Sequence, residues 1–166
     1  MKKILIIGSN FGSKIYLKVI KKLFKKSVVH ICSPNINKKK INGKNIIKFK
    51  DYKSLIINES YDLIICSTNP KTQYQFLKLF IKYKKKSKLM LEKPLAHNLR
   101  AIFDLFKNLK TKNVIFSQNF IYPNIWAWKK FYSNLKKING FKKINYKWYF
   151  NQAYFKNKKK TWKINN

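Results

Sequence analysis

Acidic residues and arginine are scarce in this sequence. Its 166 residues include five Asp and Glu against 39 Lys and Arg, which gives a formal net charge of +34, and Arg100 is the one arginine. Lysine, isoleucine and asparagine together occupy 79 positions, and all three have A/T-rich codons. We therefore attribute most of the charge to a biased genome rather than to a surface built to bind a polyanion.

Glycine, proline and cysteine are also few. Four glycines and four prolines leave little room for linkers. The two cysteines, Cys32 and Cys66, lie apart in apolar segments, where we expect buried free thiols. No apolar run reaches the roughly 20 residues of a membrane span, and the first run ends at Gly8, too early for a signal peptide. We expect a globular cytoplasmic protein with no metal and no membrane partner.

Short apolar runs alternate with amphipathic stretches over the first two thirds of the chain. The apolar runs predict strands at residues 3–7, 28–32, 45–49, 61–66, 88–91 and 114–116. Helical spacing predicts helices over about residues 16–24, 52–58, 76–81 and 99–109. Strands that are apolar throughout and separated by helices are typical of a parallel sheet covered on both faces. We predict an α/β fold, a Rossmann-type doubly wound sheet, over residues 1–118.

Residues 119–166 follow a different pattern. Residues 123–137 are predicted to be helical and residues 141–150 to form one long strand. One helix and one strand cannot make a core, so we expect the truncated start of an α+β domain. An aromatic sheet edge around Trp148 and Tyr149 would then pair with a second copy or with a complementing chain.

A glycine turn, residues 8–12, joins the first predicted strand to the first predicted helix. Glycine lets the backbone approach a dinucleotide pyrophosphate, and the helix N-terminus offers free N–H groups. The strict pattern requires glycine at positions 8, 10 and 13, where this chain has Gly8, Asn10 and Ser13, with an additional Gly12. Asparagine is the best substitute for glycine in the left-handed backbone conformation. A plain strand–turn–helix connection fits the same residues.

The end of the second predicted strand indicates the cofactor. An acidic residue there would hold the ribose 2′-hydroxyl of NAD. This chain has Ser33, followed by lysines at positions 38, 39 and 40 that can neutralise the 2′-phosphate of NADP. Because lysine is abundant everywhere, the pattern favours NADP only slightly over NAD.

Glu92-Lys93-Pro94 follows the predicted strand at residues 88–91. Ligands of open parallel sheets bind outside the carboxyl ends of the strands. A lysine beside a cofactor can donate to a substrate hydroxyl and take part in acid–base chemistry. Taken alone, the tripeptide also fits a loop turn with one local ion pair.

Together these segments resemble the Gfo/Idh/MocA family, the oxidoreductases of the glucose–fructose oxidoreductase and inositol dehydrogenase type. The resemblance runs in order through residues 3–12, 32–35, 49–55, 61–70 and 91–95, and Glu-Lys-Pro is its most specific motif. It implies an NAD(P)-dependent hydride transfer on a sugar or cyclitol. The expected partners are therefore a dinucleotide and a sugar-like small molecule, with residues 119–166 starting the substrate and oligomerisation domain.

The resemblance also implies roles for single residues. Lys93 would hold nicotinamide and substrate and is the catalytic candidate, Glu92 would lie in the cofactor pocket, and residues 67–70 would pass over the dinucleotide. The expected cofactor-binding residues are Gly8, Asn10, Phe11, Gly12, Ser33, Ser67, Thr68, Asn69, Pro70, Glu92, Lys93 and Asn119.

Three departures from the family pattern matter. Asn10 replaces the second glycine, and Gln73 replaces a histidine that often follows the motif at residues 67–70. The family's catalytic aspartate and histidine belong to the second domain, beyond residue 166. Of the histidines present, we expect His30 to be structural and His97 to have no catalytic role. We therefore expect a truncated chain that binds a dinucleotide but is weakly active or inactive alone, and whether it is an enzyme stays open.

Two other classes of function remain open. Lysines attract nucleic-acid phosphates, but sequence readout usually depends on arginine, and no DNA- or RNA-binding motif is present. We therefore expect salt-sensitive, non-specific binding and no specific nucleic-acid partner. The other alternative is a non-catalytic subunit that completes its sheet with another polypeptide.

Overall fold

The computed structural model describes residues 1–83, 85–119, 129–130 and 133–134. Contacts within the chain divide it into two units, Met1–Phe120 and Ile121–Asn166. In the second unit the four described residues are helical, as the prediction for residues 123–137 requires. The rest of that predicted helix and the predicted strand at residues 141–150 lie outside the described residues.

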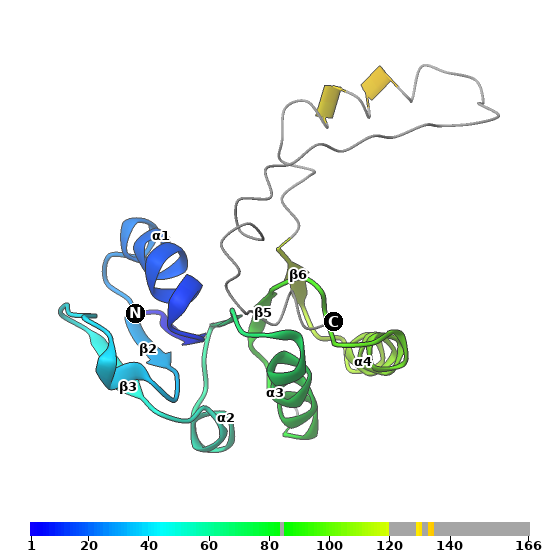
Figure 1. Ribbon diagram of the computed structural model, residues 1–166, viewed down its shortest axis with the longest axis horizontal. Coiled ribbons are helices and arrows are strands. Elements are labelled where there is room, and N and C mark those ends of the chain that lie inside the picture. The colour runs from blue at the N-terminus through cyan, green and yellow to red at the C-terminus, as the bar shows by residue number, and fades with distance from the viewer. Residues whose placement is uncertain (84, 120–128, 131–132, 135–166) are drawn as a thin grey trace, which may run out of the picture. The chain divides into compact units, whose positions relative to one another are not determined.

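The first unit is built on a parallel sheet of six strands in the order β3-β2-β1-β4-β5-β6 (Figure 1). This confirms the predicted doubly wound α/β fold. The strand order reverses between β1 and β4, and open parallel sheets bind ligands outside the carboxyl ends of the strands at such a point. The strands are β1 (Lys3–Ile7), β2 (Val28–Cys32), β3 (Ile46–Phe49), β4 (Leu63–Cys66), β5 (Lys88–Leu91) and β6 (Phe116–Gln118).

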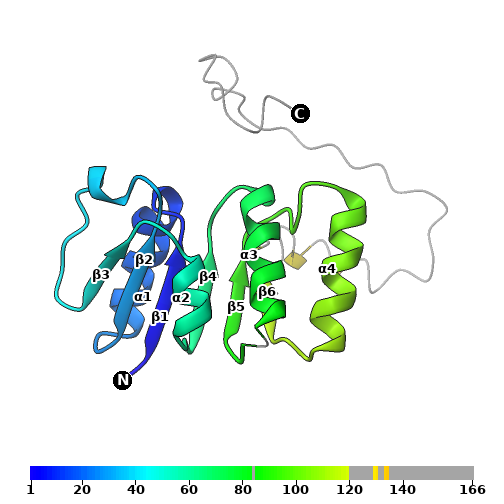
Figure 2. The same cartoon turned by 90° about the horizontal axis from the view of Figure 1, so that it is seen from below.

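Helices cover both faces of the sheet (Figures 1 and 2). A π-helical turn, η1 (Gly12–Tyr16), continues into α1 (Leu17–Leu23) on one face. The other face carries α2 (Lys53–Asn58), α3 (Pro70–Lys82) and α4 (Leu99–Thr111). A short 3-10 turn, η2 (Ile36–Lys38), interrupts the polar connection after β2. Among the described residues, no helix has the length and apolar character needed to cross a membrane.

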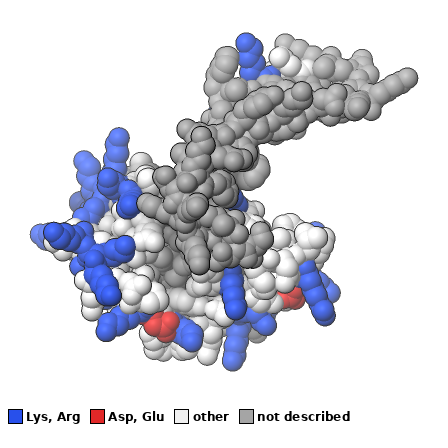
Figure 3. All heavy atoms as spheres, in the orientation of Figure 1, with Lys and Arg blue, Asp and Glu red and all other residues white. Residues whose placement is uncertain are grey.

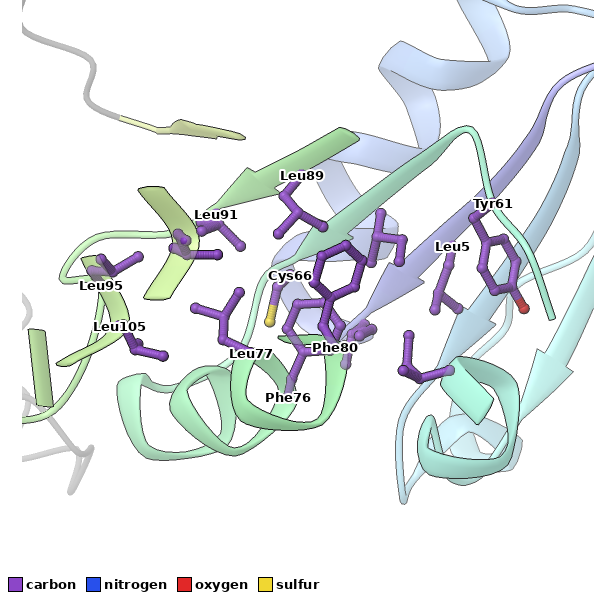
Figure 4. Packing of buried hydrophobic residues seen from close by; sticks show 14 of the residues in the cluster. Leu5, Tyr61, Cys66, Phe76, Leu77, Phe80, Leu89, Leu91, Leu95 and Leu105 are labelled. Atoms are coloured by element: carbon purple, nitrogen blue, oxygen red, sulfur yellow. The ribbon is translucent and has the colours of Figure 1, made fainter. Parts of the chain in front are cut away.

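Strands β1 to β5 contribute to two apolar layers, one on each face of the sheet. In β1, Leu5 and Ile7 face α2, α3 and α4, whereas Ile4 and Ile6 face α1. This is why the inner strands carry apolar residues at successive positions rather than only at alternate ones. The larger layer has Phe76, Leu77 and Phe80 at its centre (Figure 4). Both cysteines are buried free thiols, as predicted.

The lysines lie on the surface of this core. Figure 3 shows Lys and Arg side chains spread around the visible part of the described surface, over several elements. The one ion pair found among the described residues joins Lys3 Nζ to Glu59 Oε2 at 2.6 Å. Asp62 also contacts Lys3, because its Oδ2 accepts from the Lys3 backbone N–H at 2.7 Å.

The sixth strand begins two residues later than predicted. Asn113 has a φ of +51°, and the Val114 N–H donates to the Leu109 carbonyl oxygen at 3.0 Å. Residues 113–114 therefore still belong to the turn that ends α4. The pairing of β6 with β5 starts where Phe116 lies opposite Leu89. The strand ends at Gln118 rather than at the predicted residue 116.

His30 lies in the middle of β2 and is 4% exposed. Its Nδ1 is 2.8 Å from the Tyr61 hydroxyl, and its ring contacts Phe49. Burial, with a smaller effect from the Lys3 charge, lowers the pKa of the imidazole below its ordinary value of 6.5. The folded chain therefore favours neutral His30.

We predict that His30 makes the chain less stable in acid. Its pKa is lower in the folded than in the unfolded chain, so the unfolded chain takes up the proton first. The stability due to neutral His30 is complete above about pH 6.5 and is lost as the pH falls through the folded-state pKa. Urea unfolding across this pH range should show a smaller loss of unfolding free energy for His30→Gln, because glutamine does not titrate. The exposed His97→Gln variant is the control and should behave like the wild type; equal losses in all three chains would contradict the prediction.

Candidate functional site

The carboxyl ends of five strands bring predicted site residues together at one edge of the sheet. The backbone N–H of Gly8 donates to Cys32 at 2.8 Å, and that of Ser67 to Ile7 at 2.8 Å. The backbone N–H groups of Glu92, after β5, and of Asn119, after β6, donate to the last residues of β4 and β5. That of Ser33, after β2, donates to the last residue of β3. Five of the predicted residues, Gly8, Ser33, Ser67, Glu92 and Asn119, therefore follow neighbouring strands.

Gly8 and Gly12 pack directly against the loop that follows β4. Gly8 has a φ of +104°, and a Cβ there would lie 2.3 Å from the Ser67 carbonyl oxygen. A Cβ at Gly12 would lie 2.8 Å from Ile6 Cγ2 and 3.2 Å from Ser67 Oγ. A larger residue at Gly8 would force the backbone of the loop after β4 to move, and one at Gly12 would force the Ile6 side chain to move.

The Ser67 hydroxyl is buried between these two glycines without a partner. It is the one buried side-chain oxygen or nitrogen in the described part of the chain that lacks a hydrogen bond. A buried hydroxyl without a partner is unfavourable, so a ligand group that bonds to it would gain from the contact. The glycine turn and Ser67 thus form a cradle with an available hydroxyl.

The structure corrects the predicted backbone of the glycine turn. Asn10 is helical and is not among the described residues with positive φ, so its expected left-handed conformation is wrong. The backbone N–H and the hydroxyl of Ser13 both donate to the Ser9 carbonyl oxygen, which closes a helical turn around Asn10. The close approach to the first strand is made at Gly12 rather than at position 13.

Ser9 links the glycine turn to the end of β2. Its hydroxyl donates to Ser33 Oγ at 2.9 Å, and its side chain is buried. The chain then turns into η2, because the Ile36 N–H donates to the Ser33 carbonyl oxygen at 3.0 Å. Sequence reasoning identified Ser33 but missed Ser9, since its role depends on a contact between two separate loops.

Three side chains meet beside the glycine turn: Tyr16, Glu92 and Asn119. The Tyr16 hydroxyl donates to Glu92 Oε1 at 2.5 Å. Asn119 Nδ2 donates to the Tyr16 hydroxyl at 2.8 Å and to Glu92 Oε1 at 3.0 Å. Burial and the Glu92 carboxylate raise the pKa of Tyr16, so its hydroxyl remains a donor. Tyr16 could be recognised from the sequence only as one residue of an apolar helical pattern.

Gln73 holds the backbone of the Glu-Lys-Pro turn. Its Nε2 donates to the carbonyl oxygens of Glu92, Pro94 and Leu95 at 2.8, 3.2 and 3.1 Å. Its Oε1 accepts from the Glu92 N–H at 2.9 Å, which fixes the orientation of the amide. Gln73 is fully buried on α3, and the peptide bond between Lys93 and Pro94 is cis. The sequence marked Gln73 as a departure from the family pattern but not as a clamp.

Lys93 itself is exposed at this turn. Within the described ranges its ammonium group forms no ion pair, since the single pair there is Lys3 with Glu59. The catalytic candidate is therefore held through its backbone neighbours rather than through its own side chain. Its charge is available to a ligand at the carboxyl edge.

The remaining predicted residues also have structural roles. Asn69 caps α3, because its Oδ1 accepts from the Thr72 N–H at 2.9 Å, and Pro70 is the first helical residue. The Thr68 hydroxyl lies 3.3 Å from Cys66 Sγ. Phe11 is 49% exposed, and its ring makes an edge contact with Tyr16. These positions lie at the edge of the sheet that carries the cradle.

Two hollows lie at the opposite, amino edge of the sheet. They measure about 370 and 580 Å³ and are lined by residues 2 and 22–27 and by residues at the ends of α3 and α4. Neither includes a predicted site residue. In the part of the chain that the structure describes, no group of three His, Cys, Asp or Glu side chains could hold a metal ion.

Fold and site together define a class of protein. A glycine turn between the first strand and its helix, pressed against the loop after β4 where the strand order reverses, is the dinucleotide-binding arrangement of a Rossmann domain.

Comparison with known families confirms the resemblance. Residues 2–120 match the profile of the Gfo/Idh/MocA family, described as an oxidoreductase family with an NAD-binding Rossmann fold. Because the match covers more than half of the chain, this protein belongs to that family. The comparison with curated protein sequences found no match.

Solved structures share the fold at low sequence identity. The scyllo-inositol dehydrogenase of Lactobacillus casei, with bound NAD(H) and scyllo-inositol, has a TM-score of 0.66 at 15% identity over 82% of this chain. The myo-inositol 2-dehydrogenase of Lactobacillus plantarum has 0.68 at 18% over 82%. The WlbA dehydrogenase of Bordetella pertussis, in complex with NADH and UDP-GlcNAcA, has 0.67 at 12% over 81%. This chain spans 41%, 41% and 42% of their lengths.

We predict that Gln73→Leu destabilises the fold by about 3 kcal/mol, because it leaves a buried N–H and buried carbonyl groups without partners. Gln75→Leu on the exposed side of α3 is the matched control and should change the free energy of unfolding by less than about 0.5 kcal/mol. Urea unfolding of both variants measures the difference. Similar values for the two would show that the clamp does not stabilise the turn.

Proposed function

We propose that this chain binds a nicotinamide dinucleotide across the carboxyl edge of its sheet, as the cofactor domain of an oxidoreductase acting on a sugar or cyclitol. The observation that supports this most directly is the cradle formed by Gly8, Gly12 and Ser67, with its buried hydroxyl lacking a partner. The relatives solved with NAD(H) or NADH share the fold in which this cradle lies.

The pyrophosphate would lie at the glycine turn. The helical segment that begins at Asn10 points its N-terminus toward the carboxyl edge, where free N–H groups and the helix dipole favour an anion. Gly8 and Gly12 keep the turn free of side-chain bulk, and the Ser67 hydroxyl would donate to a phosphate oxygen. The strong positive charge of the chain would speed the encounter with this anionic cofactor.

The adenosine ribose would lie beside Ser33. The hydrogen bond from Ser9 leaves the Ser33 hydroxyl proton available to a ligand oxygen. No acidic side chain stands at position 33 to repel a 2′-phosphate. On this ground we propose NADP as slightly preferred over NAD.

The nicotinamide would lie toward Glu92 and Lys93, under the loop at residues 67–70. The bound dinucleotide would supply or accept a hydride. Lys93, exposed and without an ion-pair partner among the described residues, would donate to a substrate hydroxyl and hold the proton of the reacting group. Asn119 would complete this end of the site through its bonds to Glu92 and Tyr16.

We further propose that residues 119–166 start an α+β domain for substrate binding and oligomerisation, and that the protein is cytoplasmic. The solved relatives are about twice as long as this chain. We expect this chain to bind the dinucleotide.

Removal of the Ser67 hydroxyl tests whether the cradle binds the dinucleotide. Ser67→Ala removes a group without an internal partner, so it should leave the melting temperature almost unchanged, yet weaken NADPH or NADH binding by about fivefold. Calorimetric titration and thermal shift measure the two effects. Ser87→Ala, a buried serine before β5 at the amino edge, is the matched control and should bind like the wild type.

Two results would contradict the proposed function. One is the absence of any thermal shift with either nucleotide. The other is binding that a short DNA duplex displaces and moderate salt abolishes, which would indicate non-specific attraction to polyanions.

A further inference from the structure

Tyr16 connects parts of the site that are far apart in the sequence. It ends the π-helical turn that follows Gly12, and π turns are frequent at functional sites. Its hydroxyl reaches Glu92 after β5 and Asn119 after β6. The side chain is 6% exposed, and its ring makes an edge contact with Phe11 at 5.5 Å between centroids. The phenol is therefore fixed both at its ring and at its hydroxyl.

Two of the three hydrogen bonds of this cluster end on one carboxylate oxygen. Glu92 Oε1 accepts from the Tyr16 hydroxyl and from Asn119 Nδ2. Both hydrogen bonds recorded for this carboxylate end on Oε1, and none is recorded on Oε2 within Met1–Asn119. In a chain with 39 basic residues, this carboxylate is held by neutral donors and keeps one oxygen available.

We propose that Tyr16 is a positioning residue of the dinucleotide site: its hydroxyl fixes Glu92 by one carboxylate oxygen and presents the other to a hydrogen-bond donor of the bound dinucleotide. The proposal rests on the proposed function, because it assumes that the dinucleotide lies at this edge. The proposal also connects the two ends of the site, because the same helical turn contains Gly12 of the cradle and Tyr16, which orients Glu92. Binding at the pyrophosphate end and orientation at the Glu92 end then depend on one short segment.

The pKa of Tyr16 agrees with a constant donor role. Burial is the largest cause of its increase, and the hydrogen bond to Glu92 adds to it. Tyr16 is therefore protonated at neutral pH. A protonated hydroxyl orients a carboxylate without exchanging a proton with it.

Titration calorimetry with NADH and NADPH on the full 166-residue chain tests the proposal. The variants are Tyr16→Phe, Glu92→Gln and the double variant. Tyr61→Phe is the matched control, because Tyr61 is a buried phenol bonded to His30, remote from the carboxyl edge. We expect Tyr16→Phe to weaken binding by about tenfold, Tyr61→Phe to leave it unchanged, and the double variant to bind no more weakly than Glu92→Gln alone.

A second readout follows the phenol itself. With ¹³C-labelled tyrosine, the NMR signal lost in Tyr16→Phe identifies Tyr16, and Glu92→Gln should lower its ionisation pH toward the ordinary range. An ionisation pH that does not change in Glu92→Gln would contradict the Tyr16–Glu92 bond on which the proposal depends.

The outcomes separate the two proposals. If the wild-type chain binds neither nucleotide, the proposed function fails. If the wild type binds a nucleotide and Tyr16→Phe binds it equally well, the proposed dinucleotide binding stands and the positioning role of Tyr16 is wrong. Equal weakening by Tyr16→Phe and Tyr61→Phe would also overturn the role, because it would reflect a general loss of stability.

Discussion

The contact between Gly8 and the Ser67 carbonyl determines how the rest of the site is arranged. A side chain at position 8 would collide with the loop after β4, and that loop could then not follow β4 directly into α3. The first residues of α3 set the position of Gln73, and Gln73 sets the path of the Glu-Lys-Pro turn. Because Gly8 has no Cβ, the loops after β1, β4 and β5 can pack together at one edge of the sheet. The other close approach, at Gly12, fixes the helix that carries Tyr16 against the first strand.

Most of the fold was predictable because each element has a local cause. The strands are short apolar runs, and the helices between them repeat apolar residues at helical spacing, so both could be recognised without knowing their neighbours. The errors arose where a turn decided the boundary. Asn113 adopts a left-handed conformation and extends the end of α4, which moved β6 by two residues. At Asn10 the bonds of Ser13 to Ser9 closed a helical turn that composition alone does not reveal.

The place of the candidate residues on the fold was predictable, but their contacts were not. Strand ends and a specific tripeptide predicted that Gly8, Ser67 and Glu92 lie at the carboxyl edge of the sheet, and they lie there because parallel strands bring their carboxyl ends together. The partners of these residues depend on tertiary packing. Gln73 acts on residues 19 to 22 positions away, and Asn119 reaches Tyr16 across 103 positions. No pattern in a single sequence identifies such pairs when their residue types differ from the family's common ones.

The Gln73 clamp has a consequence for how this site could be altered. Every bond it makes goes to a main-chain N–H or carbonyl group of residues 92–95. The clamp therefore fixes the course of the turn without depending on the side chains that the turn displays. The chemistry presented at positions 92 and 93 and the shape of the loop that presents it are physically separate properties. A scaffold of this kind allows new side chains to be tried at the reacting end while α3 keeps the loop in place.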